Sequence, residues 1–169
     1  AGLLIWERQS AEFQEAERAT QNVAVTLSLS PAVRAELSDV HSGRAEFGAA
    51  SQRLQEYARA VIDRTNMSYV TVMSPAGTRY THRDPDEIGG TYRGTIPDSP
   101  RLETEVFDGT LGPSLRTIAP IEGSNGELLG WVSAGVTLST IGAAILAGLP
   151  VVLVIVVAFI VIGLIGAML

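Results

Sequence analysis

The C-terminal quarter of this sequence carries no charged side chain. Every Asp, Glu and Arg lies between Glu7 and Glu127, and none follows from Leu128 to the end. Within that stretch, residues 141–169 are almost entirely apolar and exceed the about 20 residues that a helix needs to cross a bilayer. A domain of this size could not bury such a segment on every side. We therefore expect residues 141–169 to form a transmembrane helix in the lipid bilayer.

The first six residues suggest a second membrane segment. They are apolar, end in Trp6, and are followed at once by Glu7 and Arg8. They are too short to span a bilayer, so we interpret residues 1–6 as the last turns of an earlier transmembrane helix; the alternative is an ordinary apolar N-terminus. On the first interpretation, residues 7–140 form a water-facing domain between two membrane segments, and the protein continues beyond the last residue given.

Composition excludes several functions. The chain has 169 residues and a net charge of −6, and this acidic balance argues against nucleic-acid binding. It has no cysteine, which excludes disulfide scaffolds, thiol catalysis and Cys-type zinc sites. All twelve basic residues are arginines, so lysine Schiff bases and the phosphate-loop lysine are absent. We find no pattern of catalytic residues, and expect no metal or cofactor in this part of the protein. An acidic, lysine-free and cysteine-free domain between two spans is typical of an extracytoplasmic position at the plasma membrane.

Hydrophobic periodicity predicts helices first and strands afterwards. Apolar residues recur every three or four positions in the first part of the chain, and the period changes to two after Asn66. This order predicts an α+β domain with an antiparallel sheet. The expected helices are residues 7–28, 31–37 and 45–66, and the expected five strands are residues 68–73, 78–81, 105–107, 114–121 and 127–138.

Three short segments predict the connections. Residues 75–77 (Pro-Ala-Gly) predict a hairpin between the first two strands, and residues 124–126 (Ser-Asn-Gly) predict another before the last strand. Between them Asp84 and Pro85 are typical of a helix start, and Glu87 would complete a capping box.

Four stretches of the sequence, taken together, resemble a known family. They read Gly-Thr-Arg-Tyr-Thr-His at residues 77–82, Asp-Pro-Asp-Glu-Ile-Gly at 84–89, Gly-Thr-Leu-Gly-Pro-Ser-Leu-Arg at 109–116 with Ala-Pro-Ile at 119–121, and Leu-Gly-Trp-Val-Ser-Ala-Gly at 129–135. Their order and spacing resemble the extracytoplasmic sensor domain of citrate and C4-dicarboxylate sensor histidine kinases (the CitA/DcuS family). The resemblance implies a PAS-like (PDC-type) fold: a five-stranded antiparallel sheet with a long N-terminal helix, followed by a transmembrane helix.

The resemblance also implies a site for a small carboxylate anion. Guanidinium groups and an imidazolium can hold two carboxylates through charge-assisted hydrogen bonds, and glycine-flanked backbone N–H groups can add to them. Taken singly, an arginine in a charged segment is usually a solvated surface residue, and the histidine could simply hydrogen-bond to the following turn. The residues implied are Arg79, His82 and Arg116 for the carboxylates, Thr71, Thr110 and Ser133 for hydroxyl contacts, and Leu111 within the Gly109–Gly112 turn.

One departure from the family pattern bears on the ligand. The citrate sensors have a lysine two residues after the arginine that corresponds to Arg116, where this chain has Ile118. The C4-dicarboxylate sensors have an apolar residue there. We therefore favour a dicarboxylate such as malate, succinate or fumarate over citrate, unless Arg83 or Arg93 supplies the missing charge.

These observations predict the sensor region of a two-component membrane histidine kinase. The fragment itself is not expected to be an enzyme; ATP and magnesium would belong to a cytoplasmic kinase that passes the signal to a response regulator. Binding would act on that kinase through the helix at residues 141–169. A homodimer is expected, since residues 7–28 would expose an apolar stripe. The alternatives are the same sensor on a chemotaxis receptor or a cyclic-nucleotide enzyme, or a structural or partner-binding membrane domain without a small ligand.

Overall fold

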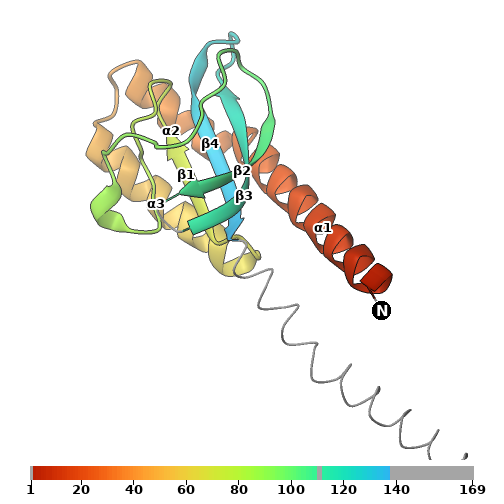
Figure 1. Ribbon diagram of the computed structural model, residues 1–169. Helices are drawn as coiled ribbons and strands as arrows, with labels where there is room; N and C mark the ends of the chain where they lie inside the picture. The colour runs from red at the N-terminus through yellow and green to blue at the C-terminus, as the bar shows by residue number, and fades with distance from the viewer. Residues whose placement is uncertain (1, 110–111, 138–169) are drawn as a thin grey trace, which may run out of the picture.

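The computed structural model describes residues 2–109 and 112–137. Three helices precede a four-stranded antiparallel sheet (Figure 1). The helices are α1 (Gly2–Ser28), α2 (Pro31–His41) and α3 (Phe47–Arg64), the strands are β1 (Tyr69–Met73), β2 (Glu103–Gly109), β3 (Gly112–Glu122) and β4 (Leu128–Thr137), and a single 3₁₀ turn, η1 (Pro85–Glu87), lies between β1 and β2.

The long N-terminal helix is confirmed. Residues 7–28 contain neither glycine nor proline, so nothing interrupts α1 before Pro31 begins α2. Among the helices described here, none is both long and apolar enough to cross a membrane. The predicted spanning segment at residues 141–169 lies outside the described residues. The interpretation of residues 1–6 as the end of another span stays a prediction.

The sheet places β4 at its centre. Its strand order is β1-β4-β3-β2, so β4 pairs with both β1 and β3, and β2 is an edge strand. In register, Thr71 of β1 faces Ser133 of β4, and Arg116 of β3 faces Gly135 of β4 on one side and Glu105 of β2 on the other. These pairings fix which side chains share a face, because side chains alternate along each strand.

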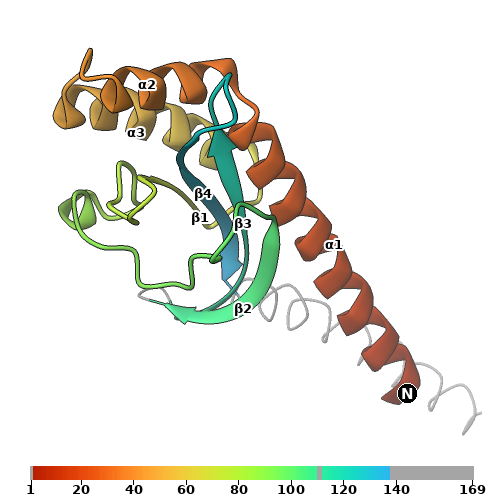
Figure 2. The same cartoon turned by 90° about the horizontal axis from the view of Figure 1, so that it is seen from above.

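The helices cover one face of the sheet. Figure 2 shows α1, α2 and α3 on one side of the sheet and the loop between β1 and β2 on the other. Leu27, Leu37 and Leu54, one from each helix, are buried in a core with Val72 and Val132. Burying each such side chain is worth about 1.5–3 kcal/mol. This core packs one face of the sheet against the helices and does not include the opposite face.

Part of the apolar stripe of α1 belongs to this core. Leu27 is buried, and Ala19 and Val23 pack against the same cluster. The expectation that α1 exposes the whole stripe is therefore wrong for its C-terminal half, because that half packs on β3 and β4. Phe13 and Val25 remain exposed. The homodimer stays a prediction.

The predicted strand at residues 78–81 is wrong, so the described sheet has four strands rather than five. Arg79 pairs with Met73 as an isolated bridge. Beyond it, Thr81 Oγ1 accepts a hydrogen bond from the backbone N–H of Val72 at 2.8 Å and donates one to the carbonyl of Val70 at 3.1 Å. A side-chain hydroxyl thus takes the place of a main-chain partner, and the ladder ends there.

The helix-start prediction at residue 84 is confirmed in part. Asp84 caps a single 3₁₀ turn, accepting from the N–H of Asp86 at 3.1 Å, and Pro85 is its first residue. The capping box is wrong, because the Glu87 carboxylate binds Arg79 instead. The turn at residues 124–126 is confirmed: Gly126 has a φ of +79°, and β3 and β4 flank it.

Candidate functional site

The sheet face turned away from the helices carries most of the predicted ligand contacts. Thr71, Ser133 and Ile118 form one row across β1, β4 and β3, and all three are buried. The next row runs through Gly135 and Arg116. Residues in such rows point to the same side of the sheet. The predicted Thr110 and Leu111 lie outside the described residues.

A small apolar cluster forms part of this face. Met73, Ile118 and Trp131 are buried together, and Tyr92 and Ile96, from the loop before β2, pack on them. The Tyr92 hydroxyl donates a hydrogen bond to Ser133 Oγ at 3.0 Å. The loop therefore covers the face, and sequence periodicity gave no sign of it.

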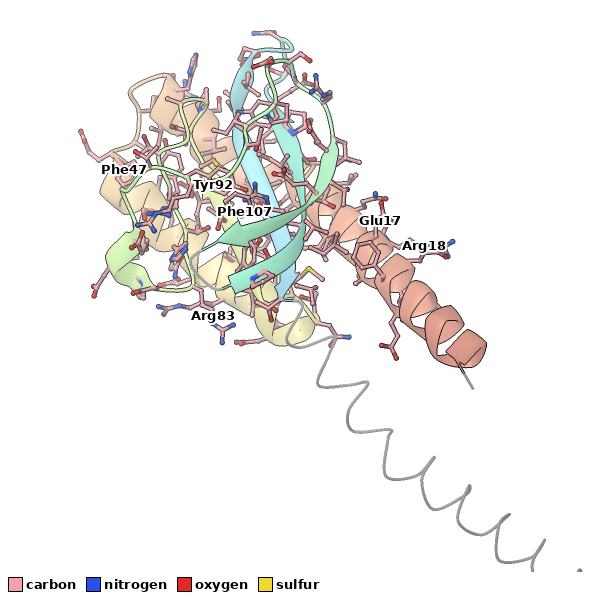
Figure 3. The ribbon with its side chains drawn as sticks, viewed as in Figure 1. Glu17, Arg18, Phe47, Arg83, Tyr92 and Phe107 are labelled. Carbon is pink, nitrogen blue, oxygen red and sulfur yellow. The ribbon has the colours of Figure 1, made fainter. Side chains whose placement is uncertain are left out.

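Arg116 is buried in this face and bound to a carboxylate of the chain. Its Nε donates to Glu105 Oε1 at 3.1 Å, and its Nη2 forms an ion pair with the same oxygen. The guanidinium carbon lies 3.7 Å from the centre of the Phe107 ring and 5.1 Å from that of Tyr92. Figure 3 shows Tyr92 and Phe107 near one another, from the loop and from β2. Two rings and one carboxylate thus hold the charge in place.

Arg79 has the same kind of partner. It is 4% exposed, and its bridge to Met73 directs it to the same face as Arg116. Its Nε donates to the Glu87 carbonyl at 3.0 Å, and its Nη2 pairs with the Glu87 carboxylate. A Cβ at Gly90 would lie 2.6 Å from Nη2, so only glycine lets the loop approach this closely.

His82 contacts α3 and the turn that follows it in the sequence. Gln55 of α3 holds its backbone, with Nε2 donating to the His82 carbonyl at 2.6 Å and the His82 N–H donating to Oε1 at 3.0 Å. Its ring Nδ1 accepts from the N–H of Asp84 at 3.1 Å. Among the described contacts, none joins His82 to Arg79 or Arg116. Its role in binding an anion stays a prediction.

Two tyrosines on this face remain protonated well above neutral pH. Burial raises the pKa of Tyr92 to about 12, although the nearby charge of Arg116 opposes the shift. Burial also raises the pKa of Tyr69, whose hydroxyl lies 3.0 Å from Ser114 Oγ. Both phenols can therefore act as hydrogen-bond donors at physiological pH.

A neighbouring donor has no partner. The indole Nε1 of Trp131 is buried, and no hydrogen-bond acceptor lies within reach among the residues described. Buried donors in proteins are nearly always paired, so this group is available to an oxygen that enters the face. Within the same described part, no three His, Asp or Glu side chains lie close enough to hold a metal ion.

Two cavities are lined by described residues outside this face. A cavity of about 460 Å³ opens between α1 and α3, with an apolar wall that includes Val23, Leu27 and Val61 and with Arg64 at its edge. A smaller one of about 120 Å³ lies beside His82 and α3. Neither of these two cavities is lined by Arg79 or Arg116.

Sequence reasoning missed the partners of the two arginines. Gly109 pairs with Gly112, and counting back along both strands from this pair places Glu105 opposite Arg116. The pairing of Glu105 with Arg116 could therefore have been predicted from the sequence. The pairing of Arg79 with Glu87 could not, since it depends on the path of an irregular loop.

Solved structures share this architecture. The chain superposes on the crystal structure of the E. coli DcuS sensor domain with a TM-score of 0.64 and 26% identity, covering 78% of this chain and 95% of that one. The sensor domain of the V. cholerae histidine kinase DctB gives a TM-score of 0.64 at 12% identity, covering 82% and 55%, which shows a shared fold. The shared fold is that of an extracytoplasmic PAS-like sensor domain of the CitA/DcuS type.

The sequence leads to the same class. Residues 7–149 match the family described as single Cache domain 3 (sCache_3_2), and the chain belongs to that family. It is also 35% identical over 78 residues to the sensor histidine kinase CitA of Klebsiella pneumoniae. That match covers 44% of this chain and 14% of the relative, so the chain spans only a small part of that protein.

Proposed function

We propose that this domain binds a small di- or tricarboxylate outside the cytoplasm, with a C4-dicarboxylate preferred over citrate. The observation that carries the proposal is the pair of buried guanidinium groups, Arg79 and Arg116, on one face of the sheet. Each already binds a carboxylate group, so their geometry suits that chemistry. A ligand with two carboxylates could replace both internal partners at once.

Neutral donors around the arginines support the same ligand class. Thr71 and Ser133 supply hydroxyls, and the Tyr92 phenol and the unpaired Trp131 indole supply further donors. Each hydrogen bond to a charged group is worth about 1.5–3 kcal/mol, less the cost of ordering the ligand. A dissociation constant of about 1 μM, or about −8 kcal/mol, is within reach of such a set.

The preference for a dicarboxylate rests on Ile118. It is 2% exposed and packs with Met73 and Trp131, so this part of the face is hydrocarbon. The two arginines that could have supplied a third charge are exposed, and Arg83 donates to the Ser68 carbonyl at 3.0 Å. A third carboxylate would therefore lack a partner at this position.

Signalling would follow β4. This strand pairs with both β1 and β3, and the chain continues from it towards the predicted membrane helix at residues 141–169. Movement of Arg116 around an anion would shift β3 and β4, and displace that helix along its length. The ligand biases this movement only by its different affinity for the two arrangements. We further propose that the output is a cytoplasmic histidine kinase, the class to which the relative CitA belongs, and that it works as a membrane-bound homodimer on a response regulator.

Titration calorimetry tests the proposed ligand. The 169-residue chain in detergent micelles would be titrated with malate, succinate, fumarate and citrate. We expect the dicarboxylates to bind with a dissociation constant of about 1 μM and citrate to bind more weakly. Changing both buried arginines, Arg79→Ala with Arg116→Ala, should abolish the heat of binding.

The matched control is Arg101→Ala. Arg101 also pairs with a glutamate, Glu103, but it is exposed and is not one of the proposed ligand contacts. Binding should persist in this variant. If no carboxylate binds the unaltered chain, or if the double variant binds as well as the control, the proposed site is wrong.

A further inference from the structure

Glu105 occupies the position at Arg116 that an entering carboxylate would need. The β2–β3 pairing places the two residues directly opposite one another. Both Nε and Nη2 of Arg116 are directed at Glu105 Oε1. These are the donors that a ligand carboxylate would use in the same side-on geometry.

The two partners differ in how easily they could separate. The Arg116 side chain is 3% exposed and contacts the rings of Phe107 and Tyr92, whereas the Glu105 side chain is 28% exposed. Glu105 also belongs to the edge strand β2. A carboxylate at the edge can turn into water at little cost, while a buried guanidinium cannot follow it. An exchange would therefore release Glu105 into water, while the Arg116 guanidinium stays within the buried face.

Charge gives the exchange its direction. Arg79 and Arg116 are balanced by Glu87 and Glu105, so these four side chains together carry no net charge. A dianion that entered while both glutamates stayed would meet two like charges at close range. It gains the full attraction of an arginine only when the glutamate has left.

We propose that Glu105 is an internal competitor of the ligand at Arg116 and that it determines the affinity of the site. The proposal rests on the proposed function, since it concerns the same face. The chain's own carboxylate must be displaced before a ligand carboxylate can bind, so each binding event carries the cost of breaking the Glu105–Arg116 pair. A chain without that charge binds the same dicarboxylate more tightly.

The test compares Glu105→Gln with Glu103→Gln. Both glutamates lie on the same strand, two residues apart, and both changes remove one negative charge from the same face. Glu103 differs in binding the exposed Arg101 at 3.2 Å. By titration calorimetry with malate, we expect Glu105→Gln to tighten binding about tenfold, or about 1.4 kcal/mol, and Glu103→Gln to change it less than about twofold.

A second measurement on the unaltered chain guards against a folding defect in the variant. Glutamine still offers an oxygen to Arg116, and circular dichroism would verify the fold. Independently, the ¹³Cδ resonance of Glu105 should move on addition of malate to the position of a solvated carboxylate. That of Glu103 should stay in place.

The outcomes separate this proposal from the proposed function. If the unaltered chain binds malate but Glu105→Gln binds it equally or more weakly, or the Glu105 resonance does not move, the competitor proposal is wrong. Weaker binding would mean that Glu105 supports binding, either by orienting Arg116 or by accepting a hydrogen bond from the malate hydroxyl. If neither protein binds any carboxylate, the proposed function itself fails.

Discussion

Thr20 Oγ1 of α1 and Thr117 Oγ1 of β3 lie 3.0 Å apart in the buried layer between the helix and the sheet. Thr117 follows Arg116 directly, so the two side chains point to opposite faces of the sheet. Thr117 Oγ1 also lies 2.9 Å from that of Thr104, the neighbour of Glu105. The contacts of α1 are thus one residue away from the Glu105–Arg116 pair, which connects the proposed ligand face to the N-terminal helix.

Thr117→Val should destabilise the domain by about 1 kcal/mol, because it removes the hydroxyl that joins Thr20 and Thr104 while keeping the volume. Urea unfolding monitored by circular dichroism measures the change in the free energy of unfolding. Thr95→Val, at an exposed position, is the control and should change it by less than about 0.5 kcal/mol. Equal effects in both variants would show that the buried hydroxyls contribute nothing.

Ile118→Lys should shift the preference of the site towards citrate. The added ammonium would offer a partner to a third carboxylate, and we expect the ratio of citrate affinity to malate affinity to rise about tenfold in calorimetry. The change also places a charge at a site that is 2% exposed, so a loss of about 3 kcal/mol in stability is expected. Ile118→Met is the uncharged control. A folded lysine variant with an unchanged ratio would refute the account of ligand preference.

Alkaline pH should destabilise the domain partly through Tyr92. Its pKa is about 12 in the folded protein and near its ordinary value of 10 in the unfolded chain. A group whose pKa is raised by folding contributes stability below the unfolded pKa and loses it as the pH rises through the folded pKa. Between about pH 9 and pH 11.5, the unaltered chain should therefore lose about 1–2 kcal/mol more than Tyr92→Phe.

Denaturant unfolding at several pH values measures this difference. The lost hydrogen bond to Ser133 lowers the stability of the phenylalanine variant by an amount that does not depend on pH in this range. Tyr69 and Tyr80 also have raised pKa values and contribute equally to both proteins. Parallel curves for the two proteins would contradict the assignment to Tyr92.

Gly94→Ala should disturb the cover of Arg116. A Cβ at this position would lie 2.1 Å from Nη1 of Arg116, which is held by Glu105 and Phe107 and cannot move freely. We expect a loss of about 1–3 kcal/mol in the free energy of unfolding. Gly48→Ala is the control, because Gly48 lies in α3 with open space around it, and alanine there should stabilise by about 0.5–1 kcal/mol. Destabilisation by both changes would contradict the contact.

The helices were predictable because their causes are local. The apolar spacing of residues 7–28 and the stop at Pro31 are properties of neighbouring residues, and α1 and α3 end within two residues of the prediction. The strand at residues 78–81 was not predictable in this way. The hydroxyl of Thr81 replaces the ladder only because Val70 and Val72 lie beside it, a tertiary contact that the period-two pattern does not contain.

The candidate site divides in the same manner. The resemblance to a known family identified Arg79 and Arg116, and the structure places both on one face. It could not supply Tyr92 or Glu87, because an irregular loop brings them to the site and no periodicity marks its path. The resemblance also named His82, but its backbone contacts with Gln55 depend on where α3 packs, which the sequence pattern does not contain.

A crystal structure of the chain with bound malate tests the central claim most directly. We predict one malate carboxylate on Arg79 and the other on Arg116, with Glu105 turned away from the guanidinium. Malate bound elsewhere, such as in the cavity between α1 and α3, with both arginine–glutamate pairs intact, would contradict it.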